Sequence, residues 1–108
     1  MKKRDYTDYL IDIKSECEFL INESNKIDYN TFASSDTLIR AFIRSLEFIG
    51  EATKHIPSYH RNKYPDIQWK SIIGMRNILI HEYFGADYYV YGLLSKIKYL
   101  YSMMLSKK

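Results

Sequence analysis

The chain has 108 residues, a net charge of +3 and 46% hydrophobic residues, and this apolar content excludes a disordered chain. Two prolines and four glycines are too few for a turn-rich all-β protein, and one cysteine excludes an internal disulfide framework and a four-thiolate zinc site. No apolar run can span a membrane, and acidic residues follow the basic N-terminus where a signal peptide needs apolar ones, so we expect one cytoplasmic domain over residues 1–108.

The first predicted helix spans residues 6–23, because apolar residues recur there every three or four positions and form one stripe. Asp5 is placed to accept hydrogen bonds from the free N–H groups of the first turn. Cys17 lies within the stripe, which predicts a buried and unreactive thiol. The apolar stripe of this helix consists of Tyr6, Leu10, Ile13, Cys17, Leu20 and Ile21. The residues that follow, 24–34, are interpreted as a polar connector.

The second predicted helix begins at Ser35 or Asp36, either of which is a good N-cap, and ends at Ile56 and Pro57. Gly50 lies in its interior, where glycine costs up to about 1 kcal/mol relative to alanine. We therefore expect another backbone to pack closely against Gly50. The apolar face of this helix consists of Leu38, Ile39, Phe42, Ile43, Leu46 and Ile49.

Two more helices are predicted after an irregular loop over residues 55–65, whose two histidines have no spacing typical of a zinc site. The third helix follows Asp66, its expected cap, and continues to about residue 83. Apolar residues cover most of its circumference, so we expect it to be the central helix. The fourth helix runs from its expected cap, Asp87, to about residue 105.

These segments, none of which alternates with period two, predict an all-α fold, an up-and-down four-helix bundle with room for a short extra helical turn before the third helix. Eleven tyrosines are unusual for this length, and five of them lie near the C-terminus. Their rings are expected to cover a helix that packs on the core or on a partner subunit. Base stacking on a single-stranded nucleic acid is the alternative.

Polar residues interrupt the apolar third helix at Arg76, Asn77 and His81. At about 100° per residue, these three share with Tyr83 one arc of roughly 160°. Arginine supplies a fixed charge and a donor fork for phosphate oxygens, histidine can take and return a proton near neutral pH, and asparagine can donate to an oxyanion. The set suits metal-independent RNA cleavage, in which the ribose 2′-OH attacks the adjacent phosphate. We expect neither a metal nor a cofactor.

The spacing of Arg76 and His81 is not specific by itself. The alternative from the residues alone is a buried polar cluster that fixes helix packing, with Arg76 paired to an acid and His81 bonded to backbone. Arg40 and Arg44 on the second helix are open to two interpretations in the same way, as part of a solvated charged face or as part of an anion site.

The third helix also carries a recognisable signature, Arg76, four residues, His81, one residue and Tyr83. This arrangement resembles the signature of HepT-type HEPN-domain toxins. The resemblance covers the chain up to Asp87, and the one departure within the signature is Glu82, because family members often have glycine after the motif histidine. Three further segments resemble the same family, residues 5–13, 44–52 and 64–69.

The resemblance implies a HEPN-like all-α homodimer in which two motif sites meet at the subunit interface. It implies a metal-independent endoribonuclease that is the toxin of a toxin–antitoxin pair, with an MNT-type nucleotidyltransferase as the antitoxin. By the resemblance, Arg76 binds phosphate, His81 is the general acid and base, and Asn77 supports positioning. Tyr83 is the residue to which the antitoxin transfers AMP.

The net charge permits contact with RNA but does not require it. Basic residues outside the motif are scattered, so we expect an RNA groove only in the dimer. The residues expected to line it with Arg76 are Arg40, Arg44, Arg61 and Lys63. The alternative function is a catalytically idle HEPN module that assembles with a nucleotidyltransferase and presents nucleotide or substrate.

Overall fold

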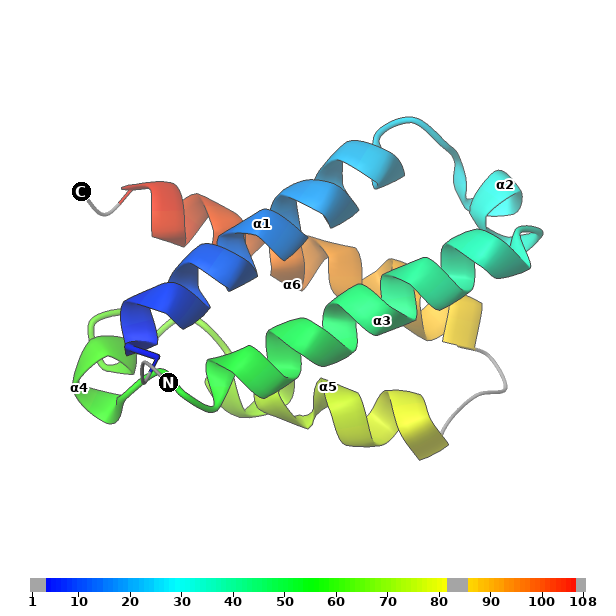
Figure 1. The fold of residues 1–108 in the computed structure, drawn as a ribbon. Helices are drawn as coiled ribbons and strands as arrows, with labels where there is room; N and C mark the ends of the chain where they lie inside the picture. The colour runs from blue at the N-terminus through cyan, green and yellow to red at the C-terminus, as the bar shows by residue number, and fades with distance from the viewer. Residues whose placement is uncertain (1–3, 82–85, 107–108) are drawn as a thin grey trace.

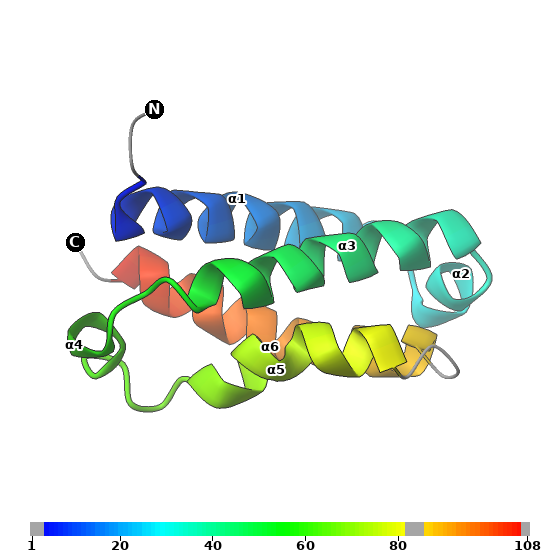
Figure 2. The ribbon, with the colours of Figure 1, turned by 60° about the horizontal axis from the view of Figure 1, so that its bottom comes forward.

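The structure, a computed structural model, describes residues 4–81 and 86–106 of the chain. The described residues form helices and connecting segments without a strand, so the all-α prediction is confirmed. The four long helices, α1, α3, α5 and α6, run alternately up and down (Figures 1 and 2). In chain order the helices are α1 Tyr6–Ser24, α2 Tyr29–Ala33, α3 Asp36–Thr53, α4 Ser58–Arg61, α5 Trp69–His81 and α6 Ala86–Ser106.

Side-chain caps explain where the first helices begin. The Asp8 carboxylate accepts a hydrogen bond from the Asp5 backbone N–H at 3.1 Å in the first turn of α1. Ser35 Oγ accepts one from the Leu38 N–H at 3.2 Å, which confirms the predicted N-cap of α3. Asp28 caps α2 by accepting from the Thr31 N–H at 2.8 Å, a hydrogen bond that lowers the pKa of its carboxyl. This cap turns part of the expected polar connector into a helix.

The segment before α5 is held by the indole of Trp69. Its Nε1–H donates to the carbonyl oxygens of Arg61 and Tyr64, both at 3.1 Å. The short helix α4 lies in this segment and supplies the extra helical turn expected before the motif helix. Two expected caps are wrong: α5 begins at Trp69 rather than directly after Asp66, and Asp87 lies inside the first turn of α6.

The central helix is α3, not α5, so the expectation that the third long helix is central is wrong. Helix α3 packs against α1, α5, α6 and α2, whereas α5 packs mainly on α3 at the edge of the bundle (Figure 1). The apolar residues around α5 were misleading because Ile78, which contributes to them, is 41% exposed. One side of α5 therefore faces away from the core.

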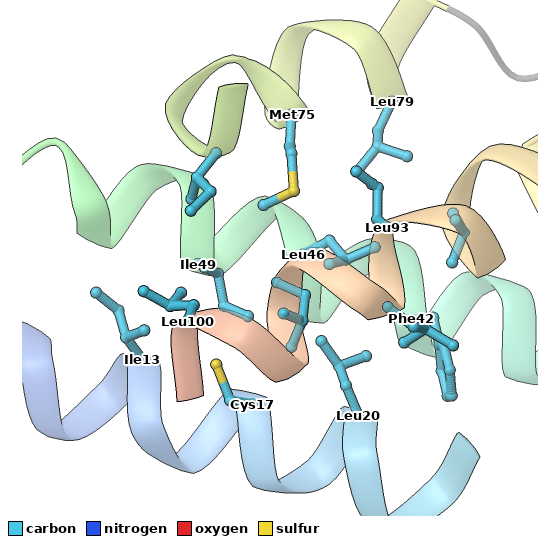
Figure 3. Close-up of a cluster of buried hydrophobic side chains, with 14 of the residues drawn as sticks. Ile13, Cys17, Leu20, Phe42, Leu46, Ile49, Met75, Leu79, Leu93 and Leu100 are labelled. Carbon is cyan, nitrogen blue, oxygen red and sulfur yellow. The ribbon is translucent and has the colours of Figure 1, made fainter. Parts of the chain in front are cut away.

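The core lies where the four long helices meet (Figure 3). Its labelled side chains are each at most 3% exposed. Burial of an aliphatic or aromatic side chain of this size contributes about 1.5–3 kcal/mol, so this cluster is the main source of stability. The labelled residues are Ile13, Cys17, Leu20, Phe42, Leu46, Ile49, Met75, Leu79, Leu93 and Leu100.

Gly50 marks the point where α3 and α5 come closest, as its position in the sequence predicted. A Cβ atom added to Gly50 would lie 3.0 Å from the carbonyl oxygen of Ile72 and 3.7 Å from the backbone nitrogen of Arg76. Both atoms belong to the backbone of a helix and cannot move away at low cost. The missing side chain therefore sets the distance between the two helices that carry the candidate site.

We expect Gly50→Ala and Gly92→Ala to change stability in opposite directions. The new methyl group at position 50 meets the Ile72 carbonyl, and overpacking of this kind costs about 1–3 kcal/mol. The methyl group at position 92, in α6, has no atom within 4 Å, so it only gains helix propensity, up to about 1 kcal/mol. Urea unfolding of both variants measures the difference. Equal stabilisation by both changes would contradict the close approach at Gly50.

Cys17 is completely buried in the core, which confirms the first half of the prediction for this thiol. Burial, with smaller contributions from the charges of Glu16 and Glu18, raises the pKa of the thiol to about 12. The raised pKa means that the stabilisation from the neutral thiol is complete below about pH 9 and is lost as the pH rises toward 12.

We therefore expect the native chain to resist alkylation by iodoacetamide at about pH 8, because the thiolate is the reactive form. The pKa of about 12, against 9.0 for a free thiol, leaves about 10³-fold less thiolate. The chain unfolded in urea should react at the rate of a free cysteine. Rapid modification of the native protein, followed by mass spectrometry, would show that the thiol is accessible.

The tyrosines of α6 divide into packed and exposed rings. Tyr89, Tyr91 and Tyr101 pack against the core, as expected, and Tyr101 donates a hydrogen bond to Glu18 at 2.8 Å. Tyr88, in contrast, is 77% exposed. The Tyr29 hydroxyl donates to Asp87 at 3.0 Å and so attaches α2 to the first turn of α6.

None of the helices in the described part of the chain is long and apolar enough to cross a membrane.

Candidate active site

The two polar residues in the middle of α5 lie on its solvent-facing side. The Arg76 side chain is 48% exposed, and Asn77 is exposed as well. Met75 and Leu79, on the other side of the helix, point into the core (Figure 3). The burial expected for Arg76 and Asn77 in a polar cluster is therefore wrong, whereas the expected pairing of Arg76 with an acid is confirmed by Glu51.

Arg76 lines a solvent-open pocket of about 500 Å³ between α1, α3 and α5. A second arginine, Arg44 of α3, lines the same pocket, so two guanidinium groups from different helices border one space. Arginine forks from two directions can bind the oxygens of one phosphate or of neighbouring phosphates. The lining residues are Glu16, Arg44, Ser45, Glu47, Phe48, Glu51 and Arg76.

Glu51 is the acidic partner of Arg76. Its Oε1 atom lies 3.9 Å from Arg76 Nε, which is an ion-pair distance but too long for a hydrogen bond. Both side chains are about half exposed, so this pair contributes at most about 1 kcal/mol. Glu51 Oε2 is also 3.6 Å from Lys54 Nζ. A phosphate that makes two charge-assisted hydrogen bonds to Arg76 can therefore replace this contact.

The other polar and charged side chains in and near the pocket differ in the hydrogen bonds and ion pairs that they form. Glu16 Oε1 accepts a short hydrogen bond from Ser45 Oγ at 2.6 Å. Arg44 forms no ion pair with any residue that the structure describes. The Arg40 Nε atom, in contrast, donates to Asp36 Oδ2 at 2.8 Å, and Arg40 does not line the pocket.

His81 is the last residue of α5, five positions after Arg76, and so about 7.5 Å further along the helix axis. Gly50 of α3 lies opposite residues 72–76 of the antiparallel α5. Counting along both helices from that contact places the backbone of His81 about level with Ile43, next to Arg44. The His81 side chain and the whole of Tyr83 lie outside the described residues.

Arg61 and Lys63 are not brought to Arg76 within one chain. Arg61 ends α4 and Lys63 lies two residues later, at the end of the bundle opposite the C-terminal end of α5 (Figures 1 and 2). The Nε–H of Arg61 donates to the carbonyl oxygen of Ile56 at 2.9 Å. That Arg61 and Lys63 line an RNA groove stays a prediction. Such a groove requires a second subunit, or an RNA long enough to extend from Arg76 to α4.

The whole of this pocket lies inside a recognisable family region. The sequence model of a family described as "Ribonuclease HepT-like" matches residues 7–92. The chain belongs to the HepT-like ribonuclease family. The match extends from α1 into α6 and includes all seven residues that line the pocket as well as His81.

Several relatives of the chain carry the names of putative or probable ribonucleases. The chain is 51% identical over 80 residues to "Putative RNase TTE0752" of Caldanaerobacter subterraneus subsp. tengcongensis, which covers 74% of this chain and 71% of the relative. It is 46% identical over 88 residues to "Putative RNase MJ1380" of Methanocaldococcus jannaschii, with 82% and 81% covered. It is 40% identical over 85 residues to "Probable ribonuclease HepT" of Thermococcus cleftensis, with 79% and 77% covered. No solved structure gives a significant match.

The sequence predicts no site role for five of the residues that line this pocket. Four of them lie in the segment 44–52 that resembles the family, and the fifth is Glu16; the four are Ser45, Glu47, Phe48 and Glu51. Glu16 comes from α1, and no local pattern predicts that it faces Ser45 of α3 across the helix interface. The one usable signal was Gly50, which indicated close packing of two helices without saying which residues this packing brings together.

Proposed function

We propose that this chain is a metal-independent endoribonuclease whose active site contains Arg76 and His81. The observation that carries the proposal is the pair of guanidinium groups, Arg44 and Arg76, on one solvent-open pocket. Asn77 lies beside Arg76 and is exposed, so its amide can donate to a phosphate oxygen or to the ribose. His81 follows on the same helix and supplies an imidazole, a side chain that can take and return a proton.

The proposed reaction is an internal transfer at one phosphate of the RNA. The ribose 2′-OH gives its proton to an imidazole and its oxygen attacks the adjacent phosphorus, while the bond from phosphorus to the 5′-oxygen breaks. The departing 5′-oxygen takes a proton from an imidazolium, which leaves a 2′,3′-cyclic phosphate and a 5′-hydroxyl. Arg76 binds the non-bridging oxygens, where negative charge increases in the transition state.

A homodimer with two meeting sites suits this chemistry. One imidazole cannot be a base and an acid in the same step, whereas two copies of His81 can divide these roles. Phe48, which lines the pocket on α3, is 38% exposed, and a second subunit would cover it. The proposed partners are therefore a second copy of this chain and single-stranded RNA.

We further propose that the chain is the toxin of a cytoplasmic toxin–antitoxin pair, neutralised by an MNT-type nucleotidyltransferase. The Tyr83 hydroxyl would attack the α-phosphate of ATP, forming a tyrosyl adenylate and releasing pyrophosphate. An adenylate adds a negative phosphate and a nucleoside two residues after His81, where it competes with RNA for Arg76 and fills the groove. The support is the position of Tyr83 in the motif, and an AMP mass increase on a Tyr83 peptide tests it.

One feature of the pocket favours the second candidate, a catalytically idle module that assembles with a nucleotidyltransferase. Three carboxylates, from Glu16, Glu47 and Glu51, line the same space as the two arginines. They oppose the binding of a polyanion at the surface of the pocket. This candidate predicts a stable complex with the nucleotidyltransferase and no RNA cleavage by the chain alone.

The proposed function is tested by incubating purified protein with single-stranded RNA in excess EDTA. Mass spectrometry first establishes that Tyr83 carries no AMP. Cleavage that is unaffected by EDTA supports the ribonuclease. An unmodified protein that leaves the RNA intact, but binds the nucleotidyltransferase, would favour the idle module.

A further inference from the structure

A stack of aromatic and cationic side chains lies just beyond the C-terminal end of α3. The His55 imidazole stacks on the Tyr9 ring with 4.1 Å between centroids and 8° between planes. The Arg4 guanidinium carbon is 4.4 Å from the centroid of the same Tyr9 ring. His55 is itself exposed, so the stack is open to a flat ligand.

The surroundings of this stack combine aromatic rings with paired charges, because Arg4 forms an ion pair with Asp12 of α1 and Lys54 one with Glu51 of α3 at 3.6 Å. Residues 54–64 contain Lys54, Arg61 and Lys63, two histidines and two tyrosines, but no aspartate or glutamate. The Tyr59 ring, 58% exposed, packs edge-on against Tyr6 at 5.9 Å, one turn of α1 before Tyr9. We call the set Arg4, Tyr9, Lys54, His55 and Tyr59 the stacking platform.

The stacking platform continues the surface of the candidate active site. Arg44, Phe48 and Glu51 follow one another along α3 at helical spacing and line the pocket, and His55 comes four residues later. The helical positions from Arg44 to Thr53 correspond to about 14 Å along α3, and His55 follows in the turn after the helix. Glu51 contacts both Arg76 and Lys54, at 3.9 and 3.6 Å, so it lies between the two regions.

We propose that the stacking platform binds a nucleobase of the RNA, a few nucleotides away from the phosphate held at Arg76. This inference rests on the proposed ribonuclease function, and it adds a second contact that the motif does not contain. Stacked rings beside cations are the common device for binding single-stranded RNA, because every base has a π face and the phosphates need positive charge. The platform thus favours RNA long enough to span both regions.

The first test measures binding, independent of cleavage. The probe is a fluorescent 2′-O-methyl oligoadenylate of about twelve nucleotides, which has no free 2′-OH and is not cleaved. His55→Ala should raise the Kd about tenfold, the effect of losing one stacked base, and His55→Tyr should restore affinity because it keeps a ring. Lys54→Ala should lower the salt slope by about 0.7, the value for one phosphate contact on a single strand. Tyr99→Ala removes an exposed ring of α6 outside the platform and is the matched control.

The second test separates this inference from the proposed function. On a long single-stranded RNA, His55→Ala should raise the KM for cleavage and leave kcat at the wild-type value, because the stacked base contributes to binding and not to the chemical step. Equal Kd values for wild type and His55→Ala would overturn the platform, even if the protein cleaves RNA. Loss of self-association in His55→Ala with unchanged RNA affinity would also overturn it and would make this surface a protein interface. Binding that depends on His55 without any cleavage would support the platform and overturn the ribonuclease.

Discussion

Replacing His81 with alanine is expected to slow RNA cleavage by about 10²–10⁴-fold, the usual contribution of a general acid or base. The proposed mechanism has no other side chain that takes the proton from the 2′-OH at neutral pH. The measurement is the cleavage rate at saturating RNA, with the melting temperature recorded beside it.

A second histidine variant provides the control for His81→Ala. His60 lies in α4, where its ring contacts Tyr6 and Tyr64 at the other end of the bundle. His60→Ala removes an imidazole and some packing, but it should leave the cleavage rate of the folded protein unchanged. Equal losses of activity in the two variants would indicate that stability, rather than proton transfer, determines the rate.

Replacing Arg76 with alanine is expected to slow cleavage by about 10²–10³-fold, as for the loss of one preorganised donor to a developing anion. Arg76→Lys should recover only part of the rate, because an ammonium group keeps the charge but lacks the planar fork that binds two phosphate oxygens. Single-turnover kinetics distinguish this effect on the chemical step from an effect on RNA binding.

The control for Arg76 is Lys98→Ala, which removes an exposed positive charge from α6 outside the pocket. It should lower RNA affinity only through the net charge, without changing the single-turnover rate. If Arg76→Lys were as active as wild type, the requirement for a two-pronged phosphate contact would be wrong, and a simple positive charge would be sufficient.

The helices that the sequence predicts well are those whose signals are local. The stripe from Tyr6 to Ile21 and the cap at Ser35 depend on neighbours within one turn, and α1 and α3 form as expected. The central position of α3 could not be predicted in this way. The apolar residues around α5 predict a core position for the whole helix, but Ile78 is at the surface. Only the packing of all four helices decides which face of α5 is covered.

The candidate site was predictable only in the part that one helix carries. Arg76, Asn77 and His81 share one side of α5 by spacing, and the exposure of the first two agrees with a site open to a ligand. Arg44 was one of several scattered cations until the close approach at Gly50 placed it on the pocket of Arg76. Arg61 and Lys63 are predicted beside it by charge alone, and the fold puts them in and just after α4, outside the pocket.

The central claim is that Arg76 and His81 cleave RNA by internal attack of the 2′-OH, and the chemical ends of the products test it most directly. RNA cut by the wild-type protein in EDTA should carry 2′,3′-cyclic phosphate and 5′-hydroxyl ends, and His81→Ala should produce neither. Products with 3′-hydroxyl and 5′-phosphate ends would show that water, not the 2′-OH, attacks the phosphorus. That result would contradict the mechanism even if the protein proved to be an active ribonuclease.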